Sequence, residues 1–330
     1  MKNQNSKGKI QKITAVHAVL LLPFYFLLFN CAAQQTLQYS QFMLNNYGLN
    51  PAACGLSSNR IEVLTGFRRQ WIGFPQAPTS AFMNMNVYLG RKGGGLNRGW
   101  HGVGAYWQSD QAGEIIKTSD FYGSYTYHLR MTRKYYAAFG LAAGMRRYRF
   151  GISEISDPVL RSNLIWLYPD FIPGVKFYTG KWTFDLSVKQ LYKFKAKQGE
   201  NQSGSPSKLS PHVYFSAYHK WWARTYLLVI QSVHVKYHYS SLPSVDLNML
   251  AFLNKNFAVG ASYRHMDAVV AMVQFRYDKL VVGLSYDYTI APYRIGFANS
   301  QEYMLGIAPS PWSESQAQQY RTAECPTFQY

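Results

Sequence analysis

Residues 121–130, FYGSYTYHLR, alternate between two kinds of side chain along the whole stretch. One set of positions is mostly apolar, Phe121, Gly123, Tyr125, Tyr127 and Leu129, and the other is mostly polar, Tyr122, Ser124, Thr126, His128 and Arg130. A period of two is typical of a β-strand with one apolar and one polar face. A tilted strand needs about ten residues to cross a bilayer, whereas soluble strands usually have about five or six. The pattern therefore favours a membrane-spanning strand.

The same alternation recurs along the chain, for example in TSAFMNMNVYLG at 79–90 and in LVVGLSYDYTI at 280–290. Fourteen segments are candidate strands, near 60–70, 80–90, 100–109, 118–130, 134–149, 170–179, 181–192, 211–220, 224–237, 246–253, 256–265, 268–277, 279–290 and 300–307. Tight turns, such as 131–133, 180–181 and 221–224, contrast with long polar connections at 150–169 and 193–210. Short turns at one end and long loops at the other are typical of outer-membrane barrels.

The sequence thus predicts an all-β fold, an outer-membrane antiparallel β-barrel of about 14 strands over residues 60–307. The long loops are expected outside the cell. Both ends of the barrel, and a C-terminal tail at 308–330, are expected on the periplasmic side. No domain boundary divides the barrel region, and no second apolar run is long enough for a membrane-spanning helix.

The first 33 residues are typical of a signal peptide that is cleaved before Gln34. Lys2, Lys7, Lys9 and Lys12 precede an apolar run at 13–29, and the small residues of CAA follow it. Two alternatives stay open, an uncleaved membrane anchor and a lipidated Cys31. All three interpretations take the chain out of the cytoplasm.

Charge alone would permit a nucleic-acid partner. Four of the 34 Lys and Arg lie in the signal peptide, which leaves 30 against 16 acids and a net charge near +14. Export removes the chain from nucleic acid, and no basic run is longer than two residues. Nucleic acid is therefore not expected among the partners, while membrane lipid is.

A search for catalytic or metal-binding patterns finds no constellation. His234 and His238 are four residues apart, but on a strand they would lie about 13 Å apart, too far for one ion. Asp120, Asp185 and Asp287 are single acids on polar faces, without a partner nearby in the sequence. No phosphate-binding loop motif is present. We expect no cofactor, no metal and no enzymatic activity, with a catalytic site built from loops as the open alternative.

Five sequence blocks are distinctive: QYSQFMLNNYGLNPAACG at 38–55, GFRRQWIGFPQAPTSAFMNMN at 66–86, GLSYDYTI at 283–290, QEYMLGI at 301–307 and CPTF at 325–328. In this order and combination they resemble the PorP/SprF family of type IX secretion system membrane proteins. The resemblance implies an outer-membrane barrel that serves the export of particular cargo proteins, including gliding adhesins. It also implies that a secreted cargo protein and other type IX components are partners.

Residues 34–59 form an N-terminal segment on the periplasmic side, before the first strand. Its residues 36–55 carry many amides and aromatic rings and no charge, which suits packing against a polar barrel wall. We expect the segment either to lie in the periplasm or to plug the barrel mouth. Bulky residues on the inward faces, Phe82, Tyr88, Tyr106 and Tyr122, predict a partly filled interior.

Candidate contact residues lie in the first outward loop. Arg68, Arg69, Trp71 and Phe74 are residue types that are common at protein interfaces. The alternative is an architectural loop that covers the lumen, with Trp71 in an interfacial girdle. Trp71, Trp100, Trp182, Trp221 and Trp222 all fall at predicted strand ends, where such a girdle is expected.

Cys54 precedes the first strand and Cys325 follows the last one. Closure of a barrel makes these strands neighbours, and the periplasm is oxidising, so we predict a Cys54–Cys325 disulfide. For the function, the expectation is a non-enzymatic secretion component. The alternative is an outer-membrane channel for diffusion or uptake of a small solute.

Overall fold

The computed structural model describes residues 37–56, 61–90, 99–113, 115–150, 164–191, 210–224, 226–239, 241–253, 256–277, 279–290 and 299–308. These residues divide into two units. The larger unit, residues 37–238 with 243–330, holds the sheet. Of the smaller unit, only Tyr239, Ser241 and Leu242 are described, and all three are exposed.

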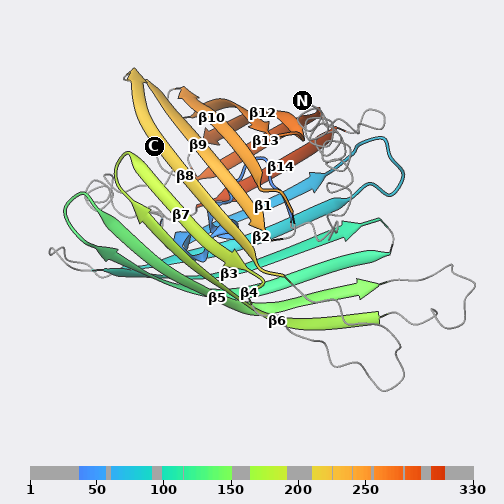
Figure 1. Ribbon diagram of the computed structural model, residues 1–330. Coiled ribbons are helices and arrows are strands. Elements are labelled where there is room, and N and C mark those ends of the chain that lie inside the picture. Colours follow the sequence, from blue (N-terminus) through green and yellow to red (C-terminus); the bar gives the residue numbers. More distant parts are fainter. Residues whose placement is uncertain are drawn as a thin grey trace, which may run out of the picture. The chain divides into compact units, whose positions relative to one another are not determined.

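Fourteen antiparallel strands form one closed barrel, in which the first strand pairs with the last (Figure 1). They are β1 (Ile61–Arg69), β2 (Thr79–Leu89), β3 (Trp100–Ala112), β4 (Ile116–Arg130), β5 (Tyr136–Phe150), β6 (Leu164–Tyr178), β7 (Trp182–Lys189), β8 (His212–Arg224), β9 (Leu227–His238), β10 (Ser244–Leu253), β11 (Phe257–Arg264), β12 (Ala268–Tyr277), β13 (Leu280–Thr289) and β14 (Ser300–Ile307). The predicted fold class is confirmed, and each candidate strand overlaps one of these.

Two boundaries differ from the prediction for identifiable reasons. β6 begins at Leu164 rather than near 170 because its pairing with β5 continues past Pro169 and Pro173, residues that usually argue against a central strand. The predicted turn at 221–224 belongs to β8, where a register shift lies between Trp222 and Arg224.

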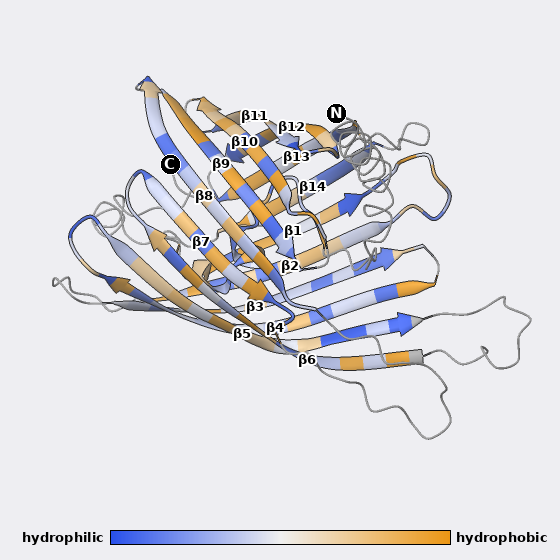
Figure 2. Cartoon of the chain, in the orientation of Figure 1, coloured by the Kyte–Doolittle hydropathy of each residue, from blue (hydrophilic) through white to orange (hydrophobic). Residues whose placement is uncertain are grey.

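Alternation along the strands separates an apolar outer face from a mostly polar inner one. Figure 2 shows this as alternating orange and blue bands. In β4, Phe121 is 60% exposed and Tyr125 is also exposed, whereas Tyr122, Thr126 and His128 are buried in the interior. The lipid-facing and interior sets are those that the sequence pattern predicted. Among the described residues, no helix is long and apolar enough to span a membrane.

Connections alternate between the two ends of the barrel. Ile61 and Ile307 lie at the end that also carries the turns after β4, β6, β8, β10 and β12, here called the terminal end. The connections at 70–78, 113–115 and 265–267 lie at the other end, here called the opposite end. The long connections after β5 and β7 start from the opposite end, and most of their residues are outside the described ranges.

Residues 37–56, here called the plug, lie inside the barrel. Nearly all of them are buried, and they include the short helix α2 (Asn46–Leu49) and the 3-10 helix η1 (Pro51–Ala53). The Asn50 side chain caps η1 by accepting a hydrogen bond from the Ala52 amide at 2.9 Å. Of the two places that the sequence left open for this segment, its described residues occupy the interior; residues 34–36 and 57–59 lie outside the described ranges.

Apolar side chains of the plug pack against the barrel wall in two buried clusters. Leu44 and Tyr47 pack with Phe82, Tyr106 and Tyr122 in one buried cluster. Phe42, Met43 and Leu49 pack in another with wall residues from β8, β9, β10 and β11. Phe82, Tyr106 and Tyr122 are buried and Tyr88 is partly buried, which confirms the prediction of a partly filled interior.

Candidate functional site

The plug is fastened where its backbone meets the last strand. The backbone amides of Ser40 and Gln41 donate to the two carboxylate oxygens of Glu302 at 2.8 and 2.9 Å. Glu302 lies on the inward face of β14 and is fully buried. One carboxylate thus binds two successive peptide N–H groups, an arrangement that is stronger than two neutral hydrogen bonds.

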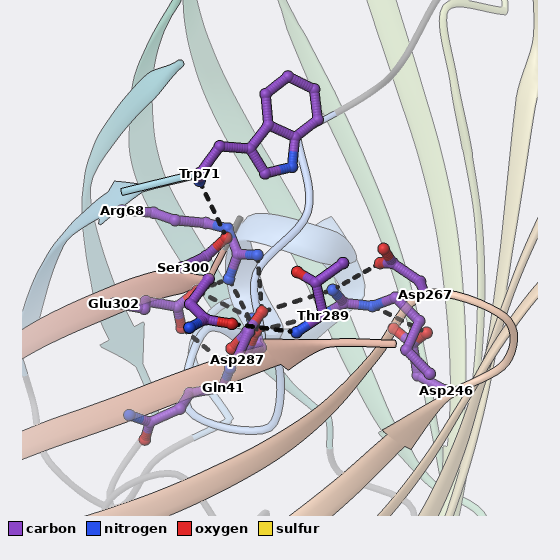
Figure 3. Close-up of polar contacts among 12 residues, drawn as sticks. Gln41, Arg68, Trp71, Asp246, Asp267, Asp287, Thr289, Ser300 and Glu302 are labelled. Carbon is purple, nitrogen blue, oxygen red and sulfur yellow. Dashed lines mark hydrogen bonds and ion pairs between the residues drawn. The ribbon is translucent and has the colours of Figure 1, made fainter. Parts of the chain in front are cut away.

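Arg68 of β1 completes this contact (Figure 3). Its guanidinium donates to the Ser40 hydroxyl at 2.7 Å, to Asp287 at 2.7 Å and to Glu302 at 3.2 Å. The Ser40 hydroxyl donates in turn to the Asp287 carboxylate. Arg68 and Glu302 are directly opposite each other across the β1–β14 pair. The plug therefore lies across the seam between the first and last strands.

The charges continue along the inner wall through Arg264 of β11. This side chain contacts Asp246 at 3.3 Å, Asp267 at 3.1 Å and Asp287 at 3.5 Å. Lys236 of β9 adds a contact to Asp246 at 3.1 Å. Within the described part of the chain, three cations, Arg68, Arg264 and Lys236, face three buried carboxylates, Asp246, Asp287 and Glu302, together with the half-exposed Asp267. We call these residues with Ser40 the seam network.

Polar wall residues bind the second half of the plug. Thr126 donates to the Pro51 carbonyl at 2.6 Å, and Asn50 donates to the Val175 carbonyl at 3.0 Å. Lys189 donates to the Gly48 carbonyl at 2.8 Å. These bonds satisfy buried carbonyl groups and the Asn50 amide, which would cost free energy if they were buried without a hydrogen-bond partner.

Close approach of η1 to the wall depends on glycine. A Cβ added at Gly140 of β5 would lie 2.4 Å from the Ala52 nitrogen. A Cβ at Gly102 of β3 would lie 2.2 Å from the Cys54 carbonyl oxygen. Both obstacles are backbone atoms, which cannot move aside as a flexible side chain can. The wall is therefore shaped for this segment of the chain.

The three acids that have no partner nearby in the sequence, Asp120, Asp185 and Asp287, all have cationic partners in the structure. Asp120 pairs with Arg146 through two contacts of 2.9 and 2.6 Å, Asp185 pairs with Lys176 at 2.5 Å, and Asp287 pairs with Arg68. His234 lies in the interior, stacked on Phe42 of the plug and bonded to Ser216, and His238 stacks on His212. The described residues contain no group of three side chains that could hold a metal ion.

Arg68 is the main correction to the predicted contact residues. Its side chain is 4% exposed and points into the barrel, because the strand alternation that turns Arg69 outward turns Arg68 inward. Arg68 is therefore not at the surface as a loop contact. Arg69 and Trp71 are exposed and Phe74 is partly exposed, so three of the four candidates remain accessible at the opposite end.

The loop at 70–78 has a defined shape. The amide of Ile72 donates to the Asn299 carbonyl at 2.8 Å, and that of Gln70 donates to the Pro78 carbonyl at 2.9 Å. Trp71 and Gln76 both have left-handed backbone angles, with φ of 50° and 59°. Residues other than glycine adopt this region at a cost of roughly 1 kcal/mol or more, so the surrounding bonds must hold it.

Trp100 and Cys54 also lie in the interior. Trp100 was expected in an interfacial girdle, but it is buried, stacks on His128 and donates to the Gly55 carbonyl at 3.0 Å. Trp71, Trp182, Trp221 and Trp222 are exposed at strand ends, as expected. Cys54 is buried inside the barrel, and burial raises the pKa of its thiol to about 12. Cys325 lies outside the described residues, so the Cys54–Cys325 disulfide stays a prediction.

Glu302, Arg264, Asp246 and Ser40 were missed as site residues. Two of their neighbours in the network, Arg68 and Asp287, were noticed for other reasons. A signal for the three charged residues was available in the sequence. Glu302, Arg264 and Asp246 each occupy the polar face of an alternating strand, and in a membrane barrel that face points into the interior. The pairing itself joins residues more than 200 positions apart, for example Arg68 and Asp287.

Three comparisons place the chain among known proteins. A family model, described as type IX secretion system membrane protein PorP/SprF, matches residues 31–307. No curated protein matches the chain. Among solved structures, the chain is similar to a FadL homologue of Pseudomonas aeruginosa, with 10% identity, a TM-score of 0.45 and coverage of 78% of this chain and 91% of that one. It is also similar to the toluene transporter TodX of P. putida (7% identity, TM-score 0.44, coverage 78% and 90%) and to the translocator domain of autotransporter NalP from Neisseria meningitidis (8% identity, TM-score 0.40, coverage 80% and 92%).

Proposed function

Because the chain belongs to the PorP/SprF family of type IX secretion system membrane proteins, we propose that it assists the export or surface retention of particular cargo proteins, such as gliding adhesins. The protein is an outer-membrane β-barrel and a membrane component of that secretion system. In this proposal it acts without catalysis, by binding cargo and other components of the system. The end with the long connections faces the outside of the cell, and both barrel termini face the periplasm.

The filled interior is the observation that carries the proposal. The plug is bound at Ser40 and Gln41 by the seam network. At Asn50 and Pro51 it is bound by Val175 of β6 and Thr126 of β4. An open diffusion pore has a water-filled polar lumen, and here the plug occupies part of the interior. The arrangement supports a barrel that holds cargo on its outer loops rather than one that conducts solutes.

The proposed cargo contact includes Arg69, Trp71 and Phe74. Arg69 is the last residue of β1, and Trp71 and Phe74 lie on the loop that follows it. The loop is held by a hydrogen bond to Asn299 and by one between its own ends, from Gln70 to Pro78. Strained backbone at Trp71 supports a functional role, since such strain is often found at binding sites. Exposed Trp and Arg side chains also commonly dominate binding energy at protein interfaces.

Replacing Trp71 and Phe74 together by Ala is expected to reduce cargo on the cell surface. Truncation of an interface anchor costs about 2 kcal/mol or more, which is roughly a thirtyfold loss of affinity. Surface cargo is measured by antibody labelling of intact cells, and assembly by heat-modifiable gel mobility. The matched control is Trp222→Ala, an exposed Trp at the terminal end. Normal cargo levels in an assembled double variant would mean that the loop is architectural.

Deletion of the whole chain tests the proposed function directly. One or a few cargo proteins should accumulate inside the cell, while uptake of small solutes stays unchanged. The two readouts are cell fractionation of cargo and the permeation rate of a small hydrophilic solute. The reverse pattern, normal cargo export with slowed solute uptake, would identify a solute channel.

A further inference from the structure

Three cations gather on the lipid-facing side of the barrel at the opposite end. Lys117 of β4 and Arg147 and Arg149 of β5 occupy outward positions and are exposed. Lys117 and Arg149 are directly opposite each other, and Arg147 lies two residues before Arg149 on β5. Directly opposite residues on one face of a sheet lie about 5 Å apart, and positions two apart about 7 Å, so one small anionic group could contact all three. We call these residues the cation patch.

The cation patch lies immediately beyond the apolar outer surface. On the outward face of the β4–β5 hairpin, the paired residues from the terminal end onward are Leu129 and Ala137, Tyr127 and Phe139, Tyr125 and Leu141, Gly123 and Ala143, and Phe121 and Met145. From Leu129 to Phe121 the strand rises roughly 27 Å, or about 21 Å along the membrane normal for a tilt near 40°. The next pairs are Ser119 with Arg147 and Lys117 with Arg149.

This depth places the cation patch at the headgroup level of one leaflet. An outer-membrane barrel has an apolar band about 25 Å tall, so charges that begin where the band ends meet the polar part of the lipid. Trp107 of β3 pairs with Phe121 at the boundary and is exposed, as is usual for an aromatic residue at this level.

The charge of the cation patch is not neutralised within the described part of the chain. No ion pair of the described residues includes Lys117, Arg147 or Arg149. Three buried cations of the interior, Arg68, Arg146 and Arg264, each face carboxylates. Other outward positions at the opposite end carry tyrosines, such as Tyr263 and Tyr286, the apolar Ile165 and Leu167 of β6, and Arg69. The described residues of this hairpin therefore present a cluster of positive charge that suits an external anion.

We propose that the cation patch binds the phosphate groups of a phosphorylated glycolipid in the outer leaflet of the outer membrane. Guanidinium groups bind phosphate through paired hydrogen bonds, and the Lys117 ammonium adds a point charge. The acyl chains of the same lipid lie against the apolar residues below, Phe121, Met145 and Leu141. The proposal depends on the outward orientation of the opposite end and is independent of any cargo role.

Binding of lipid A to the purified full-length barrel in nanodiscs tests this site. Lys117→Gln, Arg147→Gln and Arg149→Gln together should weaken binding by about tenfold or more. The matched control is a second triple variant of exposed cations at the terminal end, Arg133→Gln, Lys134→Gln and Lys181→Gln, which should bind lipid A normally. The double variant Arg147→Lys and Arg149→Lys keeps the charge without the guanidinium fork and should lose less affinity than the triple variant.

Binding measurements with different lipids identify the source of the anion. Removal of the lipid A phosphates should abolish the difference between wild type and the triple variant. Phosphatidylglycerol at equal charge should bind the cation patch more weakly than lipid A. Unchanged lipid A binding in the assembled triple variant, an equal loss in the terminal-end control, or equal binding of phosphatidylglycerol would each overturn the proposal.

Discussion

Replacement of Arg68 by Ala is expected to release the plug while the barrel remains in the membrane. Without the Arg68 guanidinium, Ser40 loses a donor at 2.7 Å. Asp287 keeps Arg264 at 3.5 Å, and Glu302 loses the one cation that pairs with it among the described residues. Removing one partner of a buried ion pair typically costs about 3–5 kcal/mol. That cost corresponds to roughly two to four orders of magnitude in the equilibrium between bound and released plug.

A single cysteine at position 41 reports the release. Gln41 is 1% exposed, so Gln41→Cys, in a chain whose three native cysteines are Ser, should react slowly with a maleimide. Addition of Arg68→Ala should raise the labelling rate by about a hundredfold or more if opening limits the reaction. Arg69→Ala is the matched control, because the neighbouring side chain faces outward. Equal labelling in the Arg68 and Arg69 variants would show that the seam network does not hold the plug.

A valine at position 140 is expected to expel η1 from the wall. The added Cβ would lie 2.4 Å from the Ala52 nitrogen and 2.5 Å from the Pro51 carbonyl carbon, distances that no packed structure tolerates. Overpacking of this kind usually costs about 1–3 kcal/mol, and here the plug can avoid the clash by leaving. A vacated interior should appear as ion conductance in planar bilayers, which the wild-type barrel should lack.

Native Cys54 provides the second readout for this variant. It follows η1 directly, is buried, and has a thiol pKa raised to about 12, so it should resist alkylation in the wild type. In a chain with Cys31 and Cys325 replaced by Ser, Gly140→Val should increase alkylation by about tenfold or more. Gly123→Val is the matched control, because a Cβ at outward-facing Gly123 meets nothing within 4 Å. Slow alkylation and no conductance in both variants would contradict the close fit of η1 to the wall.

The barrel was predictable because the lipid imposes one rule on every strand. Alternation in stretches such as 121–130 defines which face meets lipid, and closure follows because an open edge would leave peptide groups unsatisfied in the bilayer. Where that rule conflicts with local chemistry, the prediction was less accurate. Prolines concealed the first part of β6, and the aromatic pair Trp221–Trp222 concealed the continuation of β8.

The interior was predictable only in outline. Bulky inward side chains indicated that it is partly filled, but no local pattern links Ser40 to Glu302 or Arg68 to Asp287. These pairs depend on which strands close the barrel and on the register of that closure. Arg68 was predicted to be a contact residue of the first outward loop on the basis of its residue type, although the alternation of β1 assigns Arg68 and Arg69 to opposite faces.

The position of the seam network also constrains biogenesis. Arg68 and Glu302 become opposite partners only when β1 and β14 join, and Ser40 bridges them. If β1 and β14 paired around an empty interior, the buried carboxylates of Asp287 and Glu302 would lack the hydrogen bonds from Ser40 and Gln41. Each lost bond would cost about 1–3 kcal/mol. Insertion of the N-terminal segment and closure of the wall are therefore thermodynamically coupled. The seam network thereby favours correct assembly, because a barrel that closes without the plug is the less stable product.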